Sequence, residues 1–193
     1  MLEIFLAHVL IYWTSAFYWD HRNKISPILT VLHTKRVLAN QLCVILPMLL
    51  SISSYSSEQH LPSSSFCRIL LSLLIGEFTV LIVHFALHKV TCLRSFHALH
   101  HAPLTSAAQT LDSSFVEVLF MNVLAPFFPF IMLDCPMWSL KLAILAGTAH
   151  AVATHSQDLR FVGIAYDHHQ KHHHNPKTNF ATFGFADWVI GTH

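Results

Sequence analysis

The most apolar stretch of the chain ends in a pair of histidines. Residues 66–87 are long enough to cross a hydrocarbon core, which takes about 20 residues. His84 and His88 stand at the far end of this stretch, four residues apart. On a helix this spacing places both side chains on one face. We therefore expect a membrane helix that presents two imidazoles at one of its ends.

Two further histidine clusters repeat a helical spacing of i, i+3 and i+4. They are His97, His100 and His101, and His169, His172 and His173. His150 and His155 lie between these clusters in the sequence. The chain has 17 histidines, more than its 11 lysines and arginines together. Because imidazole is the commonest protein ligand of transition metals, the pattern predicts a metal site.

The composition sets a membrane environment for these histidines. Hydrophobic residues make up 53% of the chain and charged residues 11%, whereas charged residues are about a quarter of a soluble domain. The near balance of 11 basic and 10 acidic residues gives no basic surface for nucleic acid. The four cysteines, Cys43, Cys67, Cys92 and Cys135, form no CxxC pair, so we expect reduced thiols.

The apolar segments predict an all-α, integral membrane helical bundle of about four spans, in one domain over residues 1–193. The expected spans are residues 2–19, 37–55, 66–87 and a hairpin over 115–153, followed by a polar tail over 154–193. Pro126 and Pro129 interrupt the apolar region over residues 115–153, so a kinked hairpin is the alternative to two clean crossings there. Residues 2–19 lack a basic start and a small-residue cleavage site, which favours a retained anchor over a signal peptide.

The distribution of basic residues predicts which side faces the cytosol. The loops at 20–36 and 88–114 and the tail contain nine of the eleven basic residues: Arg22, Lys24, Lys35, Arg36, Lys89, Arg94, Arg160, Lys171 and Lys177. Under the positive-inside rule these segments are cytosolic. All three histidine clusters then belong to one cytosolic, histidine-rich cap.

The number and type of ligands favour two redox-active metals. A structural zinc site needs four ligands and usually includes cysteine. The Glu-x-x-His motif of carboxylate di-iron bundles and the HExxH motif of zinc proteases are both absent from the sequence. An all-histidine, di-iron centre at the membrane surface is the remaining interpretation, with a histidine-rich metal transporter or binding protein as an alternative.

Three histidine motifs carry a family resemblance. HFALH at 84–88, HALHH at 97–101 and HHQKHH at 168–173 resemble the fatty acid hydroxylase/sterol desaturase superfamily of membrane di-iron oxidases. Further segments are similar to its 4-methylsterol oxidase branch. They are KISP at 24–27, RVLANQLCVILP at 36–47, THS at 154–156 and NFATFGFADWVIGT at 179–192.

The resemblance implies a ligand set and neighbouring residues that support it. The implied metal ligands are His84, His88, His97, His100, His101, His150, His155, His169, His172 and His173. His168, Glu77, Asn179 and Asp187 are the implied supporting residues. Glu77 lies two turns before His84, about 10 Å along the helix, and so needs a partner other than that histidine.

The implied activity is oxygen-dependent hydroxylation or desaturation of a lipid, most readily a sterol. The resemblance implies two non-haem iron ions, dioxygen as co-substrate, and a cytochrome b5 or NAD(P)H reductase as electron donor. It also implies an endoplasmic reticulum membrane with the metal site facing the cytosol. A fatty acyl or aldehyde hydroxylase is an alternative, as is a lipid-binding relative without activity, since Gln157 replaces the glycine usual after HS.

Overall fold

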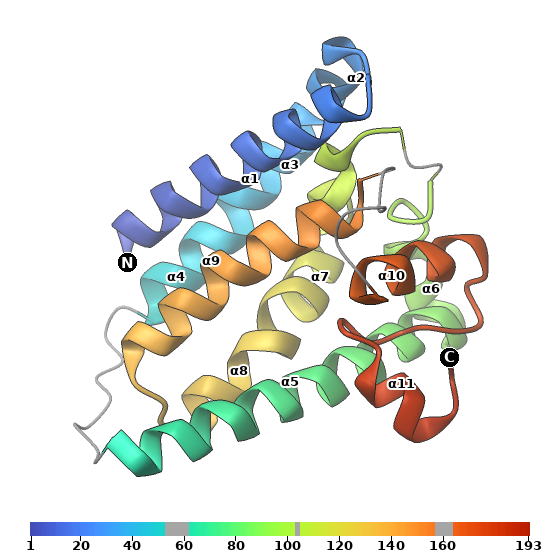
Figure 1. Cartoon of the computed structure of the whole chain (residues 1–193). Helices are drawn as coiled ribbons and strands as arrows, with labels where there is room; N and C mark the ends of the chain where they lie inside the picture. The colour runs from blue at the N-terminus through green and yellow to red at the C-terminus, as the bar shows by residue number, and fades with distance from the viewer. Residues whose placement is uncertain (53–61, 103–104, 157–163) are drawn as a thin grey trace.

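The computed structural model describes residues 1–52, 62–102, 105–156 and 164–193, and these residues form helices without any strand (Figure 1). This confirms the all-α prediction. The elements are α1 (Leu2–Arg22), α2 (Pro27–Leu32), α3 (Thr34–Asn40), η1 (Gln41–Ile45), α4 (Leu46–Ile52), α5 (Pro62–Lys89), α6 (Thr91–His97), η2 (Ala107–Leu111), α7 (Phe115–Glu117), η3 (Val118–Leu124), α8 (Ala125–Met132), α9 (Met137–Thr154), α10 (Ile164–His174) and α11 (Phe185–Ile190). Gln157 lies outside the described residues.

Three helical stretches of the described chain are long and apolar enough to cross a membrane. They are Thr34–Ile52, Ser65–Lys89 and Phe115–Met132. These stretches overlap the expected spans 37–55 and 66–87 and the first half of the expected hairpin. Helix α1 is not among them, because Glu3, His8 and its polar aromatic end lower its mean hydropathy. The three apolar helices indicate an integral membrane protein.

Both π-helical turns in the described chain come shortly before a proline. The turn η1 precedes Pro47 in α4, and η3 precedes Pro126 at the start of α8. Proline has no N–H to donate and its ring crowds the carbonyl of the preceding turn, so the helix widens locally there. The apolar stretches therefore continue past their prolines with a bend instead of ending.

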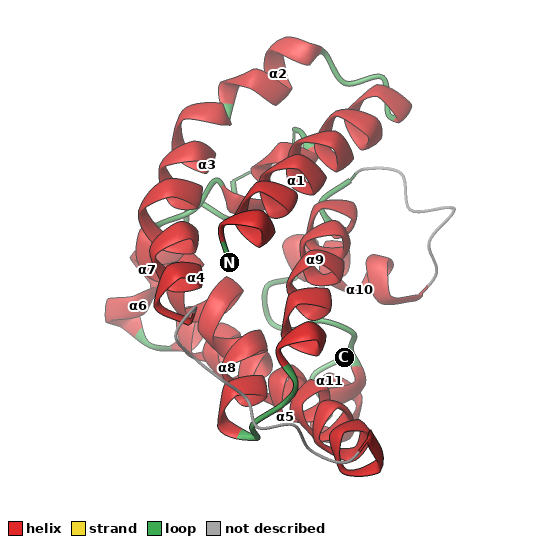
Figure 2. Ribbon diagram, turned by 90° about the vertical axis from the view of Figure 1, so that its left-hand side faces the viewer, coloured by secondary structure: helices red, strands yellow, loops and turns green. Residues whose placement is uncertain are grey.

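Residues 115–153 form the kinked hairpin that the prolines predicted. After α8 the chain reverses at Asp134, whose backbone is left-handed with φ 50°, and α9 runs back beside α8 (Figures 1 and 2). Helix α8 also packs on α5 at Gly76. A Cβ at Gly76 would lie 3.0 Å from the carbonyl oxygen of Pro126, so glycine permits this close approach.

Buried polar side chains tie the short helix η2 to α1 and α3. The Tyr12 hydroxyl donates to Ala108 O at 2.6 Å and accepts from Leu111 N at 3.2 Å. Asn40 Nδ2 donates to Leu111 O at 2.8 Å, as expected for an amide between helices. The Asp20 carboxylate accepts the N–H of Ala107 at 2.7 Å. These bonds fix the segment that connects the histidines after α6 to α7.

Replacing Tyr12 with phenylalanine tests this tie. Tyr12 is 1% exposed, so Tyr12→Phe leaves the Ala108 carbonyl and the Leu111 N–H buried without the hydroxyl. We expect the free energy of unfolding to fall by about 1–3 kcal/mol. Denaturant unfolding in detergent micelles measures it. Tyr18→Phe, at an exposed site on the same helix, is the control; equal stability of the two variants would contradict the prediction.

Candidate metal centre

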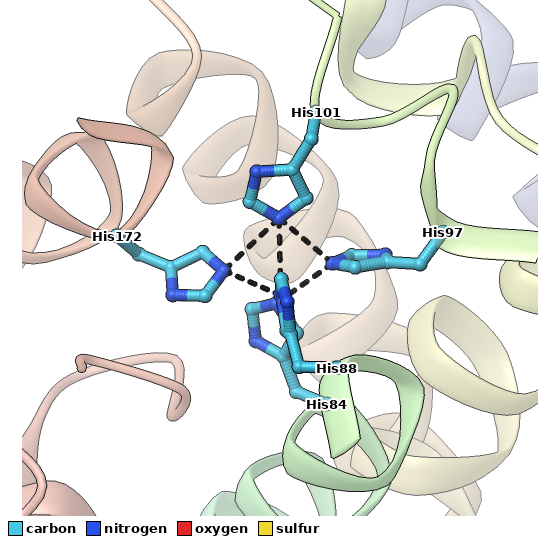
Figure 3. Close-up of side chains that lie close together, drawn as sticks. All are labelled: His84, His88, His97, His101 and His172. Atoms are coloured by element: carbon cyan, nitrogen blue, oxygen red, sulfur yellow. Dashed lines mark hydrogen bonds between the residues drawn. The ribbon is translucent and has the colours of Figure 1, made fainter. Parts of the chain in front are cut away.

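Five imidazoles from four segments of the chain meet in a first cluster. They are His84 and His88 from the end of α5, His97 from α6, His101 just after it, and His172 from α10. Their ligand nitrogens all lie within 4.8 Å of one another. The closest Nε2–Nε2 distances are 3.0–3.1 Å, drawn as dashed lines in Figure 3. The rings point towards a common centre.

Four more imidazoles form a second cluster beside the first. They are His100, His155 at the end of α9, and His169 and His173 from α10. Their closest Nε2–Nε2 distances are 3.1–3.3 Å. The ring centroids of His101 and His173, one from each cluster, lie 4.8 Å apart. The two clusters are therefore direct neighbours.

Each of the two later sequence clusters contributes to both structural clusters. His97 and His101, four residues apart, face the first cluster, and the intervening His100 faces the second. In α10, His169 and His173 share the second cluster and His172 turns to the first. The segments 97–101 and 169–173 thus lie between the two groups and hold them side by side.

Backbone carbonyls fix the proton of three rings on the side away from the centre. His84 Nδ1 donates to Phe180 O at 2.7 Å, and His172 Nδ1 donates to Thr178 O at 2.6 Å. His155 Nδ1 donates to Ala151 O at 2.8 Å. A neutral imidazole with its proton on Nδ1 has a lone pair on Nε2. These three rings therefore present metal-binding lone pairs to the clusters.

Glu117 lies beside one ring of each cluster, and the sequence analysis missed it. Its Oε1 lies 3.1 Å from His97 Nδ1 and 3.4 Å from His100 Nδ1, and the residue is 1% exposed. Neither contact has hydrogen-bond geometry, so the carboxyl group packs beside the two rings without fixing their protons. The signal was an acidic residue inside an apolar stretch, which by default has a function or a partner.

The donor set fits two metal ions. The Nε2 atoms of His84 and His97 lie 3.1 Å apart, and those of His100 and His155 lie 3.3 Å apart. Nitrogen ligands at about 2.0–2.1 Å from a metal stand about 3.0 Å apart at right angles and about 3.4 Å apart in a tetrahedron. The observed separations fall in that range.

Four cluster histidines outside the membrane stretches have lowered pKa values: His97, His101, His155 and His173. Burial, and then the neighbouring imidazole of His101, lowers the pKa of His97 to about 2. Burial likewise lowers the pKa of His101 to about 3 and that of His173 to about 2, with nearby imidazoles adding to the shift. Burial lowers the pKa of His155 to about 4. Neutral imidazole is the form that binds metal.

Three of the predicted supporting residues organise the C-terminal segment. Asp187 accepts the N–H of Phe180 at 2.8 Å and of Ala181 at 2.6 Å, and it also contacts His168 Nε2 at 2.9 Å and the Thr192 hydroxyl at 2.6 Å. Asn179 has a left-handed backbone, φ 62°, and donates its N–H to Thr192 O at 2.6 Å. These bonds hold the stretch whose carbonyls orient His84 and His172.

Glu77 has the separate partner that its distance from His84 requires. Its carboxylate accepts the backbone N–H groups of Thr182 at 3.1 Å, Phe183 at 3.0 Å and Phe185 at 3.2 Å. The partner is therefore the same C-terminal segment, about a hundred residues further along the chain. Glu77 acts on the clusters only through that segment.

His150 is the one predicted ligand that the structure leaves outside both clusters. Its ring lies against Phe183, with centroids 4.7 Å apart. His150 precedes His155 by five residues, which is a rotation of about 140° around the helix. The two side chains therefore face different directions. Nine of the ten predicted ligands therefore converge in the described chain, and the role of His150 as a ligand stays a prediction.

An apolar cavity of about 400 Å³ extends from the clusters into the bundle. His84, His100, His155 and His169 form part of its wall at the metal end. Tyr12 and Phe130 are among the residues that line it elsewhere, and most of its lining is hydrophobic. The volume is in the range of small-molecule sites, about 300–1,000 Å³.

A helical membrane protein with two adjacent histidine clusters and an apolar cavity is the class that these features define. The fatty acid hydroxylase family model matches residues 69–192, which cover both clusters and the C-terminal segment. The chain belongs to this family. Comparison with the curated proteins and with the solved structures gave no match.

Family membership defines the general chemistry. The protein is an oxidoreductase of a family of lipid hydroxylases and desaturases, and that family is known for iron-dependent catalysis. The nine histidines offer nitrogen ligands for such a metal. Among the described cysteines only Cys135 is buried, and its Sγ lies 3.1 Å from Ser72 Oγ, so thiolates take no part in either cluster.

Replacing the carboxyl group of Glu117 tests its role in both clusters. Glu117→Gln puts an amide in place of the buried carboxyl group beside His97 and His100, so we expect Fe(II) to bind about 10–100-fold more weakly. Chelator competition with the purified protein measures the affinity. Glu3→Gln, at an exposed carboxylate, is the matched control. Wild-type Fe(II) affinity in Glu117→Gln would contradict the prediction.

Acid should destabilise the metal-free protein. His97, His101 and His173 each have a pKa below 6.5 in the folded protein, so the unfolded chain binds more protons as the pH falls below 6.5. The free energy of unfolding therefore decreases from about pH 7 towards about pH 4. The contribution of these histidines to it is complete above about pH 6.5 and is lost as the pH falls below that value. Thermal unfolding of the metal-free protein in detergent measures this, and a constant melting temperature over the range would refute it.

Proposed function

We propose that the protein is an oxygen-dependent, non-haem di-iron oxidase that hydroxylates or desaturates a lipid. The observation that carries the proposal is that one apolar cavity reaches histidines of both clusters. When bound, two iron ions would activate the co-substrate dioxygen for oxidation of an unactivated C–H bond. The first cluster would hold one ion and the second cluster the other.

The chain's own residues bind and orient the reactants. The Nδ1 hydrogen bonds of His84, His155 and His172 hold these rings in place before a metal arrives. The apolar wall positions the lipid and excludes water, which prevents side reactions of the oxidant. No acid, base or nucleophile from the chain is required for removal of hydrogen from an alkyl group.

A sterol is the substrate that we propose, specifically a 4-methylsterol. The segments KISP, RVLANQLCVILP and NFATFGFADWVIGT support this choice by their similarity to the 4-methylsterol oxidase branch. The cavity wall also includes Asn122, whose Nδ2 is buried and lacks an acceptor among the described residues. A lipid with one polar group, such as the sterol oxygen, would provide that acceptor. A fatty acyl chain or aldehyde is the second candidate.

The membrane orientation follows from the positions of the basic residues. In Figure 1, α6, α10 and α11 lie at one end of the bundle, and the start of α5 and the turn between α8 and α9 lie at the other. Arg68 and Lys141 are the two basic residues outside the segments expected to be cytosolic. We therefore place the clusters at the cytosolic face of the endoplasmic reticulum membrane. A cytochrome b5 or NAD(P)H reductase would deliver electrons there.

Lipid profiling of cells with and without the protein tests the proposal. We expect 4-methylsterols to accumulate when the protein is absent and to return to normal with the wild type. His172→Ala should fail to restore them, because it removes a ring of the first cluster. His174→Ala, an exposed neighbour outside both clusters, should restore them fully.

Other outcomes of the same experiment separate the alternatives. Accumulation of acyl chains that lack a hydroxyl or a double bond, with normal sterols, would indicate the acyl hydroxylase. Unchanged lipids together with exchangeable zinc and no oxygen consumption by the purified protein would contradict the oxidase and favour metal transport.

A further inference from the structure

Phe183 belongs both to the cavity and to the outer surface. It lines the cavity, yet it is 56% exposed. Its ring lies 4.7 Å from that of His150, another residue of the cavity wall. A side chain that lines a cavity and is also exposed marks the point where the cavity meets the surface. We therefore place a mouth of the cavity at Phe183.

The surface beside this mouth is strongly apolar. Helix α11 exposes Phe185, Trp188, Val189 and Ile190, and Trp188 is 68% exposed. Four large hydrophobic side chains on one six-residue helix are more than an aqueous surface ordinarily carries side by side. Contiguous patches of this kind mark a protein or membrane contact.

The apolar surface of α11 continues onto a candidate membrane span. The Phe185 ring meets the Phe78 ring of α5 edge to face, with centroids 6.4 Å apart, and α11 lies beside α5 in both views (Figures 1 and 2). Ile82 and Phe85 of α5 are themselves exposed. Lipid that surrounds α5 is thus continuous with the face of α11, which favours the bilayer over a protein as the contact.

The backbone before α11 is prepared for an apolar environment. Irregular backbone is tolerated at membrane depth only when its polar groups are bonded within the protein. Five N–H groups of the segment are bonded to two carboxylates: Phe180 and Ala181 to Asp187, and Thr182, Phe183 and Phe185 to Glu77. In a loop exposed to water, these N–H groups could donate to solvent, so a buried carboxylate from a membrane helix would not be needed to bond them.

We propose that a lipid enters the cavity sideways from the bilayer at Phe183, and that α11 lies in the membrane interface beside that mouth. The identity of the entering lipid as an oxidase substrate rests on the proposed function. The polar tail expected over 154–193 is then outside the bilayer only in part. The size of the Phe183 side chain limits how wide an entering lipid can be.

Fluorescence quenching tests the membrane contact without any turnover. The protein is placed in phosphatidylcholine vesicles whose acyl chains carry bromine, which quenches nearby tryptophan. Wild type should lose a larger share of its emission than Trp188→Phe. In the Trp188→Phe background, Phe183→Trp should restore that loss. Asn175→Trp, at an exposed site in the turn after α10, should not restore it.

Two results of the quenching experiment would overturn the proposal. The first is equal quenching of the wild type and Trp188→Phe, which would place α11 outside the bilayer. The second is equal quenching of tryptophan at positions 183 and 175, which would show that Phe183 is no closer to the acyl chains than the polar turn after α10. Iron content and circular dichroism of each variant confirm that it is folded.

Substrate selectivity tests the mouth itself. Phe183→Ala widens it and Phe183→Trp narrows it, so the ratio of kcat/KM for a sterol to that for a linear acyl lipid should rise in the first and fall in the second. Unchanged ratios in both variants would overturn the proposal. Positive quenching without turnover of any lipid would instead refute the proposed function and leave the mouth supported.

Discussion

The convergence of nine imidazoles is the constraint on which the rest of the structure depends. The Nε2 atoms of these rings lie 3.0–3.3 Å apart and face a common centre, so the rings must be held in place from their opposite sides. The carbonyls of Phe180, Thr178 and Ala151 bond three of the rings there, and Glu117 packs beside His97 and His100. The ends of α5, α6, α9 and α10 and the C-terminal segment meet at one place for this purpose.

Two carboxylates in apolar helices give this arrangement its rigidity. Glu117 lies beside one ring of each cluster, and Glu77 bonds three N–H groups of the segment that follows Phe180. A carboxylate within a membrane helix is costly unless donors surround it. For Glu77 the donors belong to the segment that supports the metal site, so the cost of burying this carboxylate is offset by the order it gives to that segment.

Local spacing predicted much of the site, and long-range geometry accounts for what it missed. Steps of three and four residues correctly grouped His84 with His88 and predicted the convergence of the later histidines. The assignment of His100 to a second cluster depends on how the segment after α6 meets His155 at the end of α9, which spacing does not encode. His150 faces away because a step of five residues rotates about 140° around a helix. The partner of Glu77 is about a hundred residues away, so no local pattern identifies it.

The helical class and the bends at prolines were also predictable, because hydropathy and proline act locally. Pro126 and Pro129 indicated the kinked hairpin, and the structure contains it. The cavity between the helices was not predictable, since it depends on side chains from α1, α5, α8 and α9 together. Its position against both clusters connects the metal chemistry to a lipid.

The metal content of the purified protein is the most direct measurement of whether these imidazoles form a paired iron site. Protein prepared from iron-replete cells in mild detergent, with metals and protein quantified on the same sample, should contain two irons per chain. One ion per chain, or zinc in place of iron, would contradict the arrangement of two neighbouring iron sites.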